Sequence, residues 1–250
     1  MMKLKLLIAV LLLSTCSMAG NISIAVAANV SYAIDDLKKE FNKLYPDTRV
    51  QVILGSSGKL TAQIKNGAPY QLFMAANTKY PEALYKEGIA VTRPLVYAQG
   101  SLAYLSSKEQ DFSQGIKVLE SPTVNKIAVA NPKTAPYGKA AVEAMKKAGV
   151  YESVKSKYVF AESVSQTVSY AVTAADIGLI AKSSLYSPKM ARYKEGVNWA
   201  DVDPKLYTPI NQGIVVLRNG ESNCEVAAFY AFMFSDKAKK ILNDFGYLVP

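Results

Sequence analysis

Ile22-Ser23-Ile24-Ala25-Val26 is a short apolar run that predicts a buried β-strand, and the chain that follows it indicates the fold class. A polar turn comes next at Asn29, and the helical period over residues 33–44 ends at Pro46. Val50-Gln51-Val52-Ile53-Leu54 predicts a second strand, which leads into the turn Gly55-Ser56-Ser57-Gly58. This order of strand, turn, helix and strand favours an α/β fold with parallel strands flanked by helices.

The same order continues along the rest of the chain. Short apolar runs predict further strands, and helical periods follow them and end at glycines such as Gly67, Gly88 and Gly149. We expect strands at 72–75, 127–130, 158–160, 177–180 and 213–217, and later helices at 138–147, 225–234 and 236–245.

Two such runs and a late returning strand predict two lobes, of which the first is discontinuous. We expect residues 20–97 plus 212–250 to form lobe 1 and residues 98–211 to form lobe 2. The expected crossings lie near Tyr97–Tyr104 and Tyr207–Gly213.

Residues 1–19 are typical of a secretory signal peptide. Lys3 and Lys5 precede the apolar run of residues 6–13, and Ser17-Met18-Ala19 resembles a cleavage site before Gly20. The run is too short to cross a bilayer, which takes about 20 residues. We therefore expect a mature protein outside the cytoplasm.

The two cysteines leave one alternative open. Cys16 partly resembles a lipoprotein acylation site, although Thr15 fits poorly before it. Cleavage after Ala19 would remove Cys16 and leave Cys224 alone, so no intramolecular disulfide is expected.

The composition excludes several function classes. The chain has a net charge of +9 and no histidine, which rules out a Ser-His-Asp triad, a Cys-His pair and a zinc-histidine site. No basic stripe alternates with aromatic residues, so no nucleic-acid partner is expected. The turn before Lys59 lacks the spacing of a phosphate-binding P-loop. We expect no enzyme; an acyl or phosphoryl transferase would need a base near Ser57, for which Lys59 is the candidate.

Four turns share one design, because each follows a predicted strand, carries small or hydroxyl residues and opens a helix. In open α/β sheets, ligands bind beyond the carboxyl ends of the strands, and helix N-termini offer free N–H groups to an anion. Four such ends together would hold an anion with neutral donors. The alternative is that Asn29, Ser57 and Ser163 are ordinary N-caps. The turns are Ala27-Ala28-Asn29-Val30-Ser31, Gly55-Ser56-Ser57-Gly58-Lys59, Ala135-Pro136-Tyr137-Gly138 and Glu162-Ser163-Val164-Ser165-Gln166.

These turns resemble those of the periplasmic molybdate-binding proteins of ABC importers, and the resemblance runs from about Asn21 to the C-terminus. Further stretches that carry it are Gly67-Ala68-Pro69-Tyr70-Gln71-Leu72-Phe73, Asn131-Pro132 and Phe245-Gly246-Tyr247. The resemblance implies the two-lobed periplasmic-binding-protein fold, with mostly parallel sheets, a two-strand hinge and an oxyanion held in the cleft.

The resemblance also implies the site and its ligand. Asn29 and Ser57 would contribute polar side chains, and Tyr137 and Val164 would contribute backbone N–H groups. The ligand would be molybdate or tungstate, with no cofactor and no metal cation held directly. The partner would be an ABC permease in the inner membrane, and the protein would act as a monomer.

Three positions depart from the family pattern. Ala181 stands where some members have a tyrosine whose hydroxyl completes the site, so this contact is expected to come from Ser165, from another N–H or from no group at all. Gln71 and Asn77 stand where the family often has aspartates. The alternatives that remain are a receptor for sulfate, thiosulfate, phosphonate or ferric iron.

Overall fold

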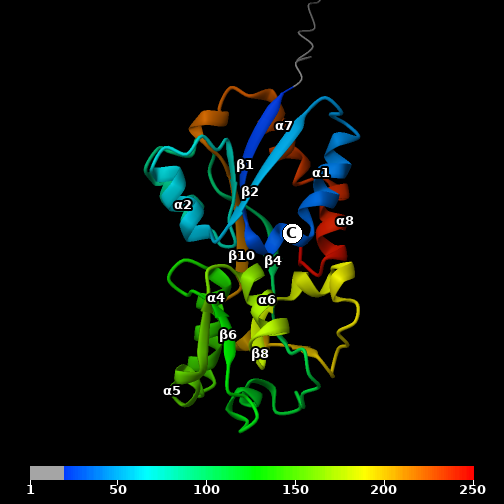
Figure 1. Ribbon diagram of the computed structural model, residues 1–250. Helices are drawn as coiled ribbons and strands as arrows, with labels where there is room; N and C mark the ends of the chain where they lie inside the picture. The colour runs from blue at the N-terminus through cyan, green and yellow to red at the C-terminus, as the bar shows by residue number, and fades with distance from the viewer. Residues whose placement is uncertain (1–19) are drawn as a thin grey trace, which may run out of the picture.

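The computed structural model describes residues 20–250, which form two lobes stacked one above the other (Figure 1). Each lobe is built on one five-stranded sheet. The predicted signal peptide and the acylation site at Cys16 lie outside the described residues. Within residues 20–250, no helix is both long enough and apolar enough to span a bilayer.

The sheet of lobe 1 has the strand order β2-β1-β3-β10-β4. β1 pairs in parallel with β2 and with β3, whereas β10 pairs antiparallel with β3 and with β4. β1 is almost completely buried because it lies between two neighbours and is covered on both faces. The bounds are β1 (Asn21–Ala27), β2 (Arg49–Gly55), β3 (Leu72–Met74), β4 (Leu95–Gly100) and β10 (Ile210–Val216).

Helices cover both faces of this sheet. α1, α7 and α8 share one hydrophobic core, in which Phe41 stacks edge-on against Phe229 and Phe232. α2 and α3 pack on the opposite face around Phe73. The elements are the 3-10 helix η1 (Ala28–Tyr32), α1 (Ile34–Asn42), α2 (Ser57–Lys65), α3 (Lys79–Lys86), the 3-10 helix η7 (Arg218–Gly220), α7 (Cys224–Phe232) and α8 (Asp236–Asp244).

Lobe 2 repeats this plan with the strand order β7-β6-β8-β5-β9. α4 and α5 pack on one face of the sheet, and α6 packs on the other. The strands are β5 (Leu102–Leu105), β6 (Ile127–Ala130), β7 (Tyr158–Ala161), β8 (Ile177–Ala181) and β9 (Trp199–Asp201), and the helices are α4 (Pro136–Lys147), α5 (Tyr151–Val154) and α6 (Val164–Thr173). Short 3-10 helices complete the lobe: η2 (Gly115–Glu120), η3 (Lys155–Lys157), η4 (Lys182–Tyr186), η5 (Pro188–Met190) and η6 (Pro204–Leu206).

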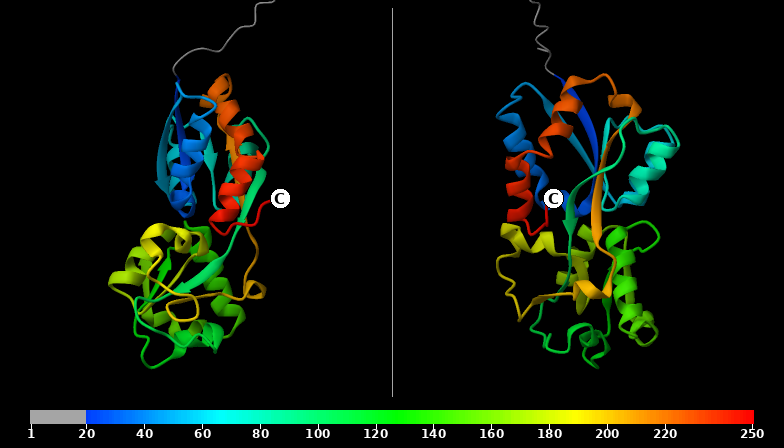
Figure 2. Two further views of the ribbon diagram at one scale, coloured as in Figure 1. Left: turned by 90° about the vertical axis from the view of Figure 1, so that its right-hand side faces the viewer. Right: turned by 180° about the vertical axis from the view of Figure 1, so that it is seen from behind.

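Two connections join the lobes. The chain leaves the first sheet at Gly100 and enters the second at Leu102, and it returns between Asp201 and Ile210 (Figure 2). Outgoing and returning strands run in opposite directions, so β4 and β10 pair antiparallel. Each sheet is therefore mixed, with two parallel and two antiparallel pairings, rather than mostly parallel as the alternation of strands and helices suggests.

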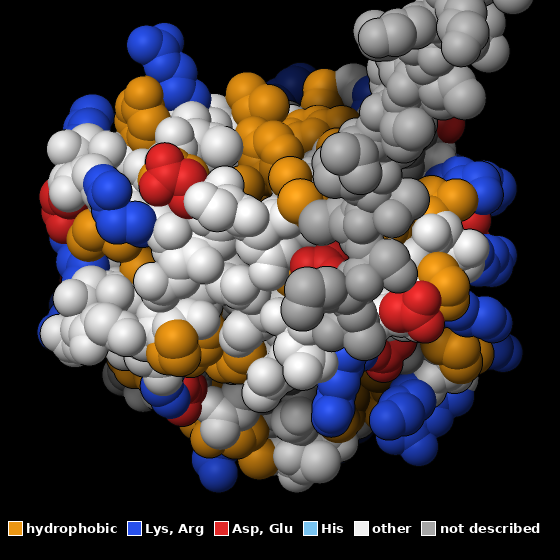
Figure 3. Space-filling model, turned by 90° about the horizontal axis from the view of Figure 1, so that it is seen from above, with side chains coloured by type: hydrophobic (Ala, Val, Ile, Leu, Met, Phe, Trp, Pro, Cys, Tyr) orange, Lys and Arg blue, Asp and Glu red, His pale blue; other side chains and the backbone are white. Residues whose placement is uncertain are grey.

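Basic side chains are dispersed over the surface. Seen from the lobe 1 end, lysines and arginines lie around the outline of the molecule with acidic side chains between them (Figure 3). Among residues 20–250, nine lysines pair with acids, as Lys43 and Lys237 do with Glu40. This face presents a mixed charged surface.

Gly138 provides a test of the packing that sets the start of α4. A Cβ at Gly138 would overlap the carbonyl group of Ala130 at the end of β6, and that backbone is fixed in the sheet. We expect Gly138→Ala to lower the free energy of unfolding by about 1–3 kcal/mol in urea denaturation. Gly55→Ala is the matched control, because its Cβ would meet only the flexible side chain of Leu60. Equal losses for the two variants would contradict this packing argument.

Candidate functional site

The four predicted turns meet at one small cavity between the lobes. Two belong to lobe 1, before η1 and α2, and two belong to lobe 2, before α4 and α6. This cavity is much smaller than the grooves on either side of it. The cavity therefore suits a small, compact ligand. It is lined by Ala27, Ala28, Asn29, Gly55, Ser56, Ser57, Ala76, Ala135, Pro136, Tyr137 and Val164.

Three α-helices begin at this cavity, and their first N–H groups have no partner inside the helix. α2 begins at Ser57, α4 at Pro136 and α6 at Val164. None of the hydrogen bonds between loops and turns of residues 20–250 uses the amide of Ser57, Tyr137 or Val164. Together with the positive ends of the helix dipoles, these amides suit a negatively charged acceptor.

Ser57 is buried, and its hydroxyl is directed by a contact with lobe 1. The backbone N–H of Ala76 donates to Ser57 Oγ at 2.9 Å. Since the oxygen accepts this bond, the hydroxyl hydrogen of Ser57 remains free to donate. Ser57 is the first residue of α2 rather than its N-cap, so capping does not compete for its side chain.

Ser56 is a site residue that the sequence pattern did not single out. It is buried, lines the cavity and has a hydroxyl without a partner among the described residues. Although Ser56 occupies the N-cap position of α2, its side chain makes no capping bond. The sequence feature that could have identified Ser56 is its position next to Ser57 in the same turn.

Asn29 is completely buried, and its carboxamide is held from behind the cavity. Its Nδ2 donates to Gln212 Oε1 at 2.8 Å and to Tyr247 Oη at 3.0 Å. Its Oδ1 has no partner among the described residues. Its backbone carbonyl accepts from Ser183 Oγ at 3.0 Å, and Ser183 follows β8 in lobe 2. Asn29 therefore belongs both to the cavity and to an interlobe contact.

Of Asn29, Ser57 and Ser163, which could all have been ordinary N-caps, only Ser163 caps its helix. Ser163 is the N-cap of α6, where its side chain accepts from the N–H of Gln166. Asn29 lies inside η1 and Ser57 inside α2, and neither caps its helix. Local sequence could not separate these cases, because all three residues follow a strand and precede a helix.

Ser165 and Ala181 lie outside the cavity lining. Ser165 faces Ser163 at 3.1 Å between the hydroxyl oxygens and lines a neighbouring groove. Ala181 is the last residue of β8, where it is buried and pairs with Leu102. Ala181 shares a buried cluster with Ala27, Tyr137 and Val164, but it is not among the residues that line the cavity.

Gln71 and Asn77 lie in different parts of the structure, and both lie outside the cavity lining. Gln71 Oε1 accepts from the N–H of Ser23 at 2.9 Å, so Gln71 is a contact within lobe 1. Asn77 lines a groove on the rim of the interlobe boundary, and its Oδ1 accepts from the N–H of Tyr80 at 3.3 Å. Neither residue is part of the cavity lining.

All side chains that line the cavity are neutral. Burial raises the pKa of Tyr137 well above its usual value, with a smaller contribution from Tyr247. Burial likewise raises the pKa of Tyr247 to about 12, so both hydroxyls stay protonated at physiological pH. Within residues 20–250, no group of three His, Cys, Asp or Glu side chains could hold a metal ion. The cavity thus offers neutral hydrogen-bond donors.

Two contacts cross the boundary between the lobes beside this site. The N–H of Gly58 donates to the carbonyl of Thr134 at 2.8 Å. Lys59 Nζ lies 2.5 Å from Glu162 Oε1, which joins α2 of lobe 1 to the turn before α6 of lobe 2. Both contacts lie on turns that line or flank the cavity, so the site depends on the closed arrangement.

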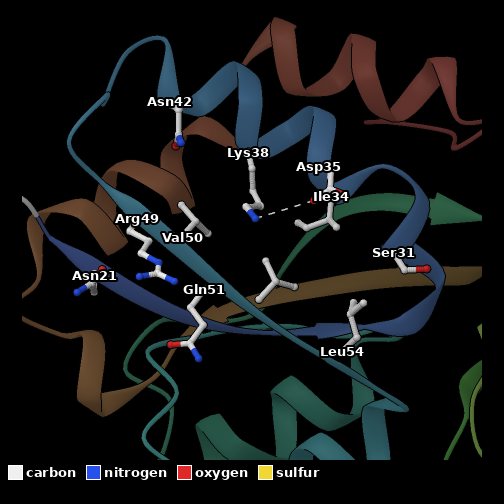
Figure 4. A pocket seen from close by; sticks show the side chains of 11 residues that line it. Asn21, Ser31, Ile34, Asp35, Lys38, Asn42, Arg49, Val50, Gln51 and Leu54 are labelled. Atoms are coloured by element: carbon white, nitrogen blue, oxygen red, sulfur yellow. Dashed lines mark ion pairs between the residues drawn. The ribbon is translucent and has the colours of Figure 1, made fainter.

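Larger hollows lie beside the cavity and away from it. Grooves of about 460 Å³ and 120 Å³ flank the lobe boundary. A pocket of about 710 Å³ lies on lobe 1 between α1 and β2, where Lys38 pairs with Asp35 and Arg49 lies nearby (Figure 4). This pocket shares no lining residue with the cavity.

Two lobes joined by two strands and closed on a cavity with free donors define a two-lobed ligand-binding protein. Residues 22–248 match the family model of bacterial extracellular solute-binding proteins, and the chain belongs to this family. It is 36% identical over 241 residues to the molybdate-binding protein ModA of Azotobacter vinelandii, covering 94% of this chain and 93% of that protein.

Two further comparisons agree with this. The chain is 34% identical over 232 residues to the molybdate-binding protein ModA of Rhodobacter capsulatus, covering 92% of this chain and 89% of that protein. The solved structure of the Azotobacter vinelandii periplasmic molybdate-binding protein matches with a TM-score of 0.84 at 30% identity, covering 92% of this chain and 99% of that chain.

The ion pair between Lys59 and Glu162 is expected to contribute little to stability, because the two side chains are 51% and 57% exposed. In a double-mutant cycle of Lys59→Met and Glu162→Gln, we expect a coupling in the free energy of unfolding of no more than about 1 kcal/mol, decreasing with added salt. A larger, salt-independent coupling would show that this pair is essential to the closed arrangement.

Proposed function

We propose that this chain captures molybdate, and also tungstate, in the interlobe cavity and delivers it to an ABC importer. The observation that supports this best is the convergence of three α-helix N-termini and two serine hydroxyls on a cavity lined by neutral groups. Ser56, Ser57, Tyr137 and Val164 would donate to the oxyanion from both lobes, so binding would hold the lobes closed.

The donor set favours a tetrahedral oxyanion over ferric iron. A ferric site would need several tyrosine hydroxyls or carboxylates facing the ligand, whereas the lining contains no carboxylate and the Tyr137 hydroxyl lies 3.3 Å from Gln212 Nε2 in the hinge. An oxyanion with four oxygens matches several fixed donors at once. Sulfate has shorter bonds to oxygen, so it would leave some donors unmet, at about 1–3 kcal/mol for each.

The same geometry argues against an enzyme. A transferase built on Ser57 would need a nearby base, and Lys59 is instead paired with Glu162 on the half-exposed rim. Ser57 Oγ accepts from a backbone amide, which favours the hydroxyl as a donor to ligand. We infer a binding protein without catalytic activity and without a cofactor.

Location and partner follow from the proposed role. The predicted signal peptide over residues 1–19 would export the chain to the periplasm, where a monomer would present the rims of both lobes to an inner-membrane permease. The mixed surface charge of the face in Figure 3 suits such a protein better than a nucleic-acid-binding one.

Isothermal titration of residues 20–250 with molybdate, tungstate and sulfate tests the proposal. We expect submicromolar affinity for molybdate and tungstate and no measurable binding of sulfate. Preference for sulfate would assign the chain to another oxyanion, and no binding of any of the three would refute an oxyanion receptor.

Ser57→Ala should weaken molybdate binding more than tenfold, because it removes a buried donor while leaving the shape of the turn. The matched control is Ser163→Ala, which removes a helix cap outside the cavity lining. For Ser163→Ala we expect a lower melting temperature with molybdate affinity nearly unchanged. If both variants lose affinity equally, Ser57 has no special role in binding.

A further inference from the structure

A buried polar network lies behind the cavity and is centred on Gln212. Gln212 belongs to the hinge strand β10 and is completely buried. Its Oε1 accepts from Asn29 Nδ2 and from the hydroxyl of Tyr97, both at 2.8 Å. Its Nε2 donates to the hydroxyl oxygen of Tyr137 at 3.3 Å. The network therefore joins lobe 1, the hinge and lobe 2.

The hinge is shaped to place these groups together. Gln212 lies opposite Ala98, but the next residue, Gly213, lies opposite Val96, so Tyr97 is an extra residue in β4. Such a bulge redirects side chains. It allows the Tyr97 hydroxyl to reach Gln212, although the two residues are not paired in the ladder.

Gly100 leaves the room that the network needs. A Cβ at Gly100 would overlap the hydroxyl of Tyr137 and crowd Nε2 of Gln212. Only a residue without a side chain lets these two groups meet beside the hinge strand.

Each end of the Gln212 carboxamide has one hydrogen-bonding role, because Oε1 only accepts and Nε2 only donates. Besides Gln212, the partner of the Asn29 carboxamide is the hydroxyl of Tyr247, which accepts from Asn29 Nδ2 and donates its own hydrogen to the backbone carbonyl of Asn29 at 2.8 Å. A hydroxyl can exchange these roles when its hydrogen turns to another acceptor. The orientation of the Asn29 carboxamide is therefore coupled to that of Gln212. In the arrangement described, Nδ2 faces Gln212 and Oδ1 is the end left without a partner.

The reversed arrangement keeps the same pairs of side chains in contact. It gives up the bond from the Tyr247 hydroxyl to the backbone carbonyl of Asn29, and the hydrogen of Tyr97 loses Gln212 Oε1 as its acceptor. If both carboxamides turn over, Gln212 Nε2 donates to Asn29 Oδ1 and to Tyr97 Oη, and the Tyr137 hydroxyl donates to Gln212 Oε1. The Tyr247 hydroxyl then donates to Asn29 Oδ1. The backbone carbonyl of Asn29 keeps its bond from Ser183 Oγ. In this arrangement the Asn29 N–H group is the free end.

We propose that Gln212 is the specificity-determining positioning residue of the site, because it sets which end of the Asn29 carboxamide meets the ligand. This inference rests on the proposed oxyanion-binding function. With Nδ2 free, Asn29 donates to an oxyanion that carries no proton, such as molybdate. With Oδ1 free, Asn29 accepts from an oxyanion that keeps a proton, such as hydrogen phosphate.

Binding of molybdate therefore selects the reversed arrangement. An unpaired carbonyl oxygen beside a dianion is repelled, whereas an N–H donor stabilises it. The hydroxyls of Tyr97, Tyr137 and Tyr247 can follow the reversal because each can exchange its donor and acceptor roles. Gln212 permits the reversal because one end of its carboxamide accepts hydrogen bonds and the other end donates them.

A double-mutant cycle tests whether Gln212 acts through Asn29. By calorimetry we expect Gln212→Leu to weaken molybdate binding at least tenfold in the wild-type background, and less than about twofold in an Asn29→Ala background. Gln99→Leu is the matched control, since Gln99 lies on hinge strand β4 outside the network; its affinity should change less than about twofold. Equal losses from Gln212→Leu in both backgrounds would overturn the proposal.

A second variant covers the case in which Gln212→Leu fails to fold. Gln212→Glu keeps the shape, and its carboxylate can only accept, so it holds Asn29 Nδ2 and leaves Oδ1 facing the ligand. At mildly alkaline pH, molybdate and hydrogen phosphate are both dianions and experience the added charge alike. We expect the ratio of molybdate to phosphate affinity to fall at least tenfold in Gln212→Glu.

The outcomes separate this inference from the proposed function. A wild-type protein that binds no oxyanion overturns both. A wild-type protein that binds molybdate, with an unchanged molybdate-to-phosphate ratio in Gln212→Glu, overturns the role of Gln212 alone. A lowered ratio supports it, because a merely structural defect or added charge would weaken both anions equally.

Discussion

Unmet hydrogen-bond donors at one point between two lobes are the constraint on which this structure depends. The amides of Ser57, Tyr137 and Val164 have no partner within their helices, and among residues 20–250 the buried hydroxyl of Ser56 has no hydrogen-bond partner. Leaving such groups unsatisfied costs about 1–3 kcal/mol each. A compact acceptor-rich ligand removes that cost at several groups simultaneously. The same physical fact would account for the proposed preference for an oxyanion and for closure of the lobes around it.

The hinge does more than connect the lobes. β4 and β10 run antiparallel, and the irregularity at Gln212 turns their side chains into the space behind the cavity. Gln212 contacts Asn29 of lobe 1 and Tyr137 of lobe 2. A polar group at this place is retained because each of its neighbours can satisfy it, and its removal would leave several buried groups unpaired.

Local sequence pattern predicted most of the framework. The strands near β1, β2 and β6 and the turns after them follow from apolar runs and turn residues, which act over a few neighbouring positions. The hinge strand β4 and the strands β5 and β9 of lobe 2 were not predicted, because their pairing depends on distant partners. Ser57 and Ser163 looked alike in the sequence because their partners lie outside the local pattern. Ser57 Oγ accepts from the N–H of Ala76, whereas Ser163 Oγ accepts from the N–H of Gln166 and caps α6.

The sequence by itself determined the α/β class, the two-lobe plan and the four turns that carry the site, because these depend on periodicity and on residues adjacent in the chain. Only the tertiary structure decided which turn atoms remain free to bind. It revealed the unpaired hydroxyl of Ser56, the absence of Ala181 from the cavity lining and the contact of Asn29 with Gln212. Whether a buried donor is free depends on partners that may lie 183 positions away in the chain, as with Asn29 and Gln212, and no local pattern encodes them.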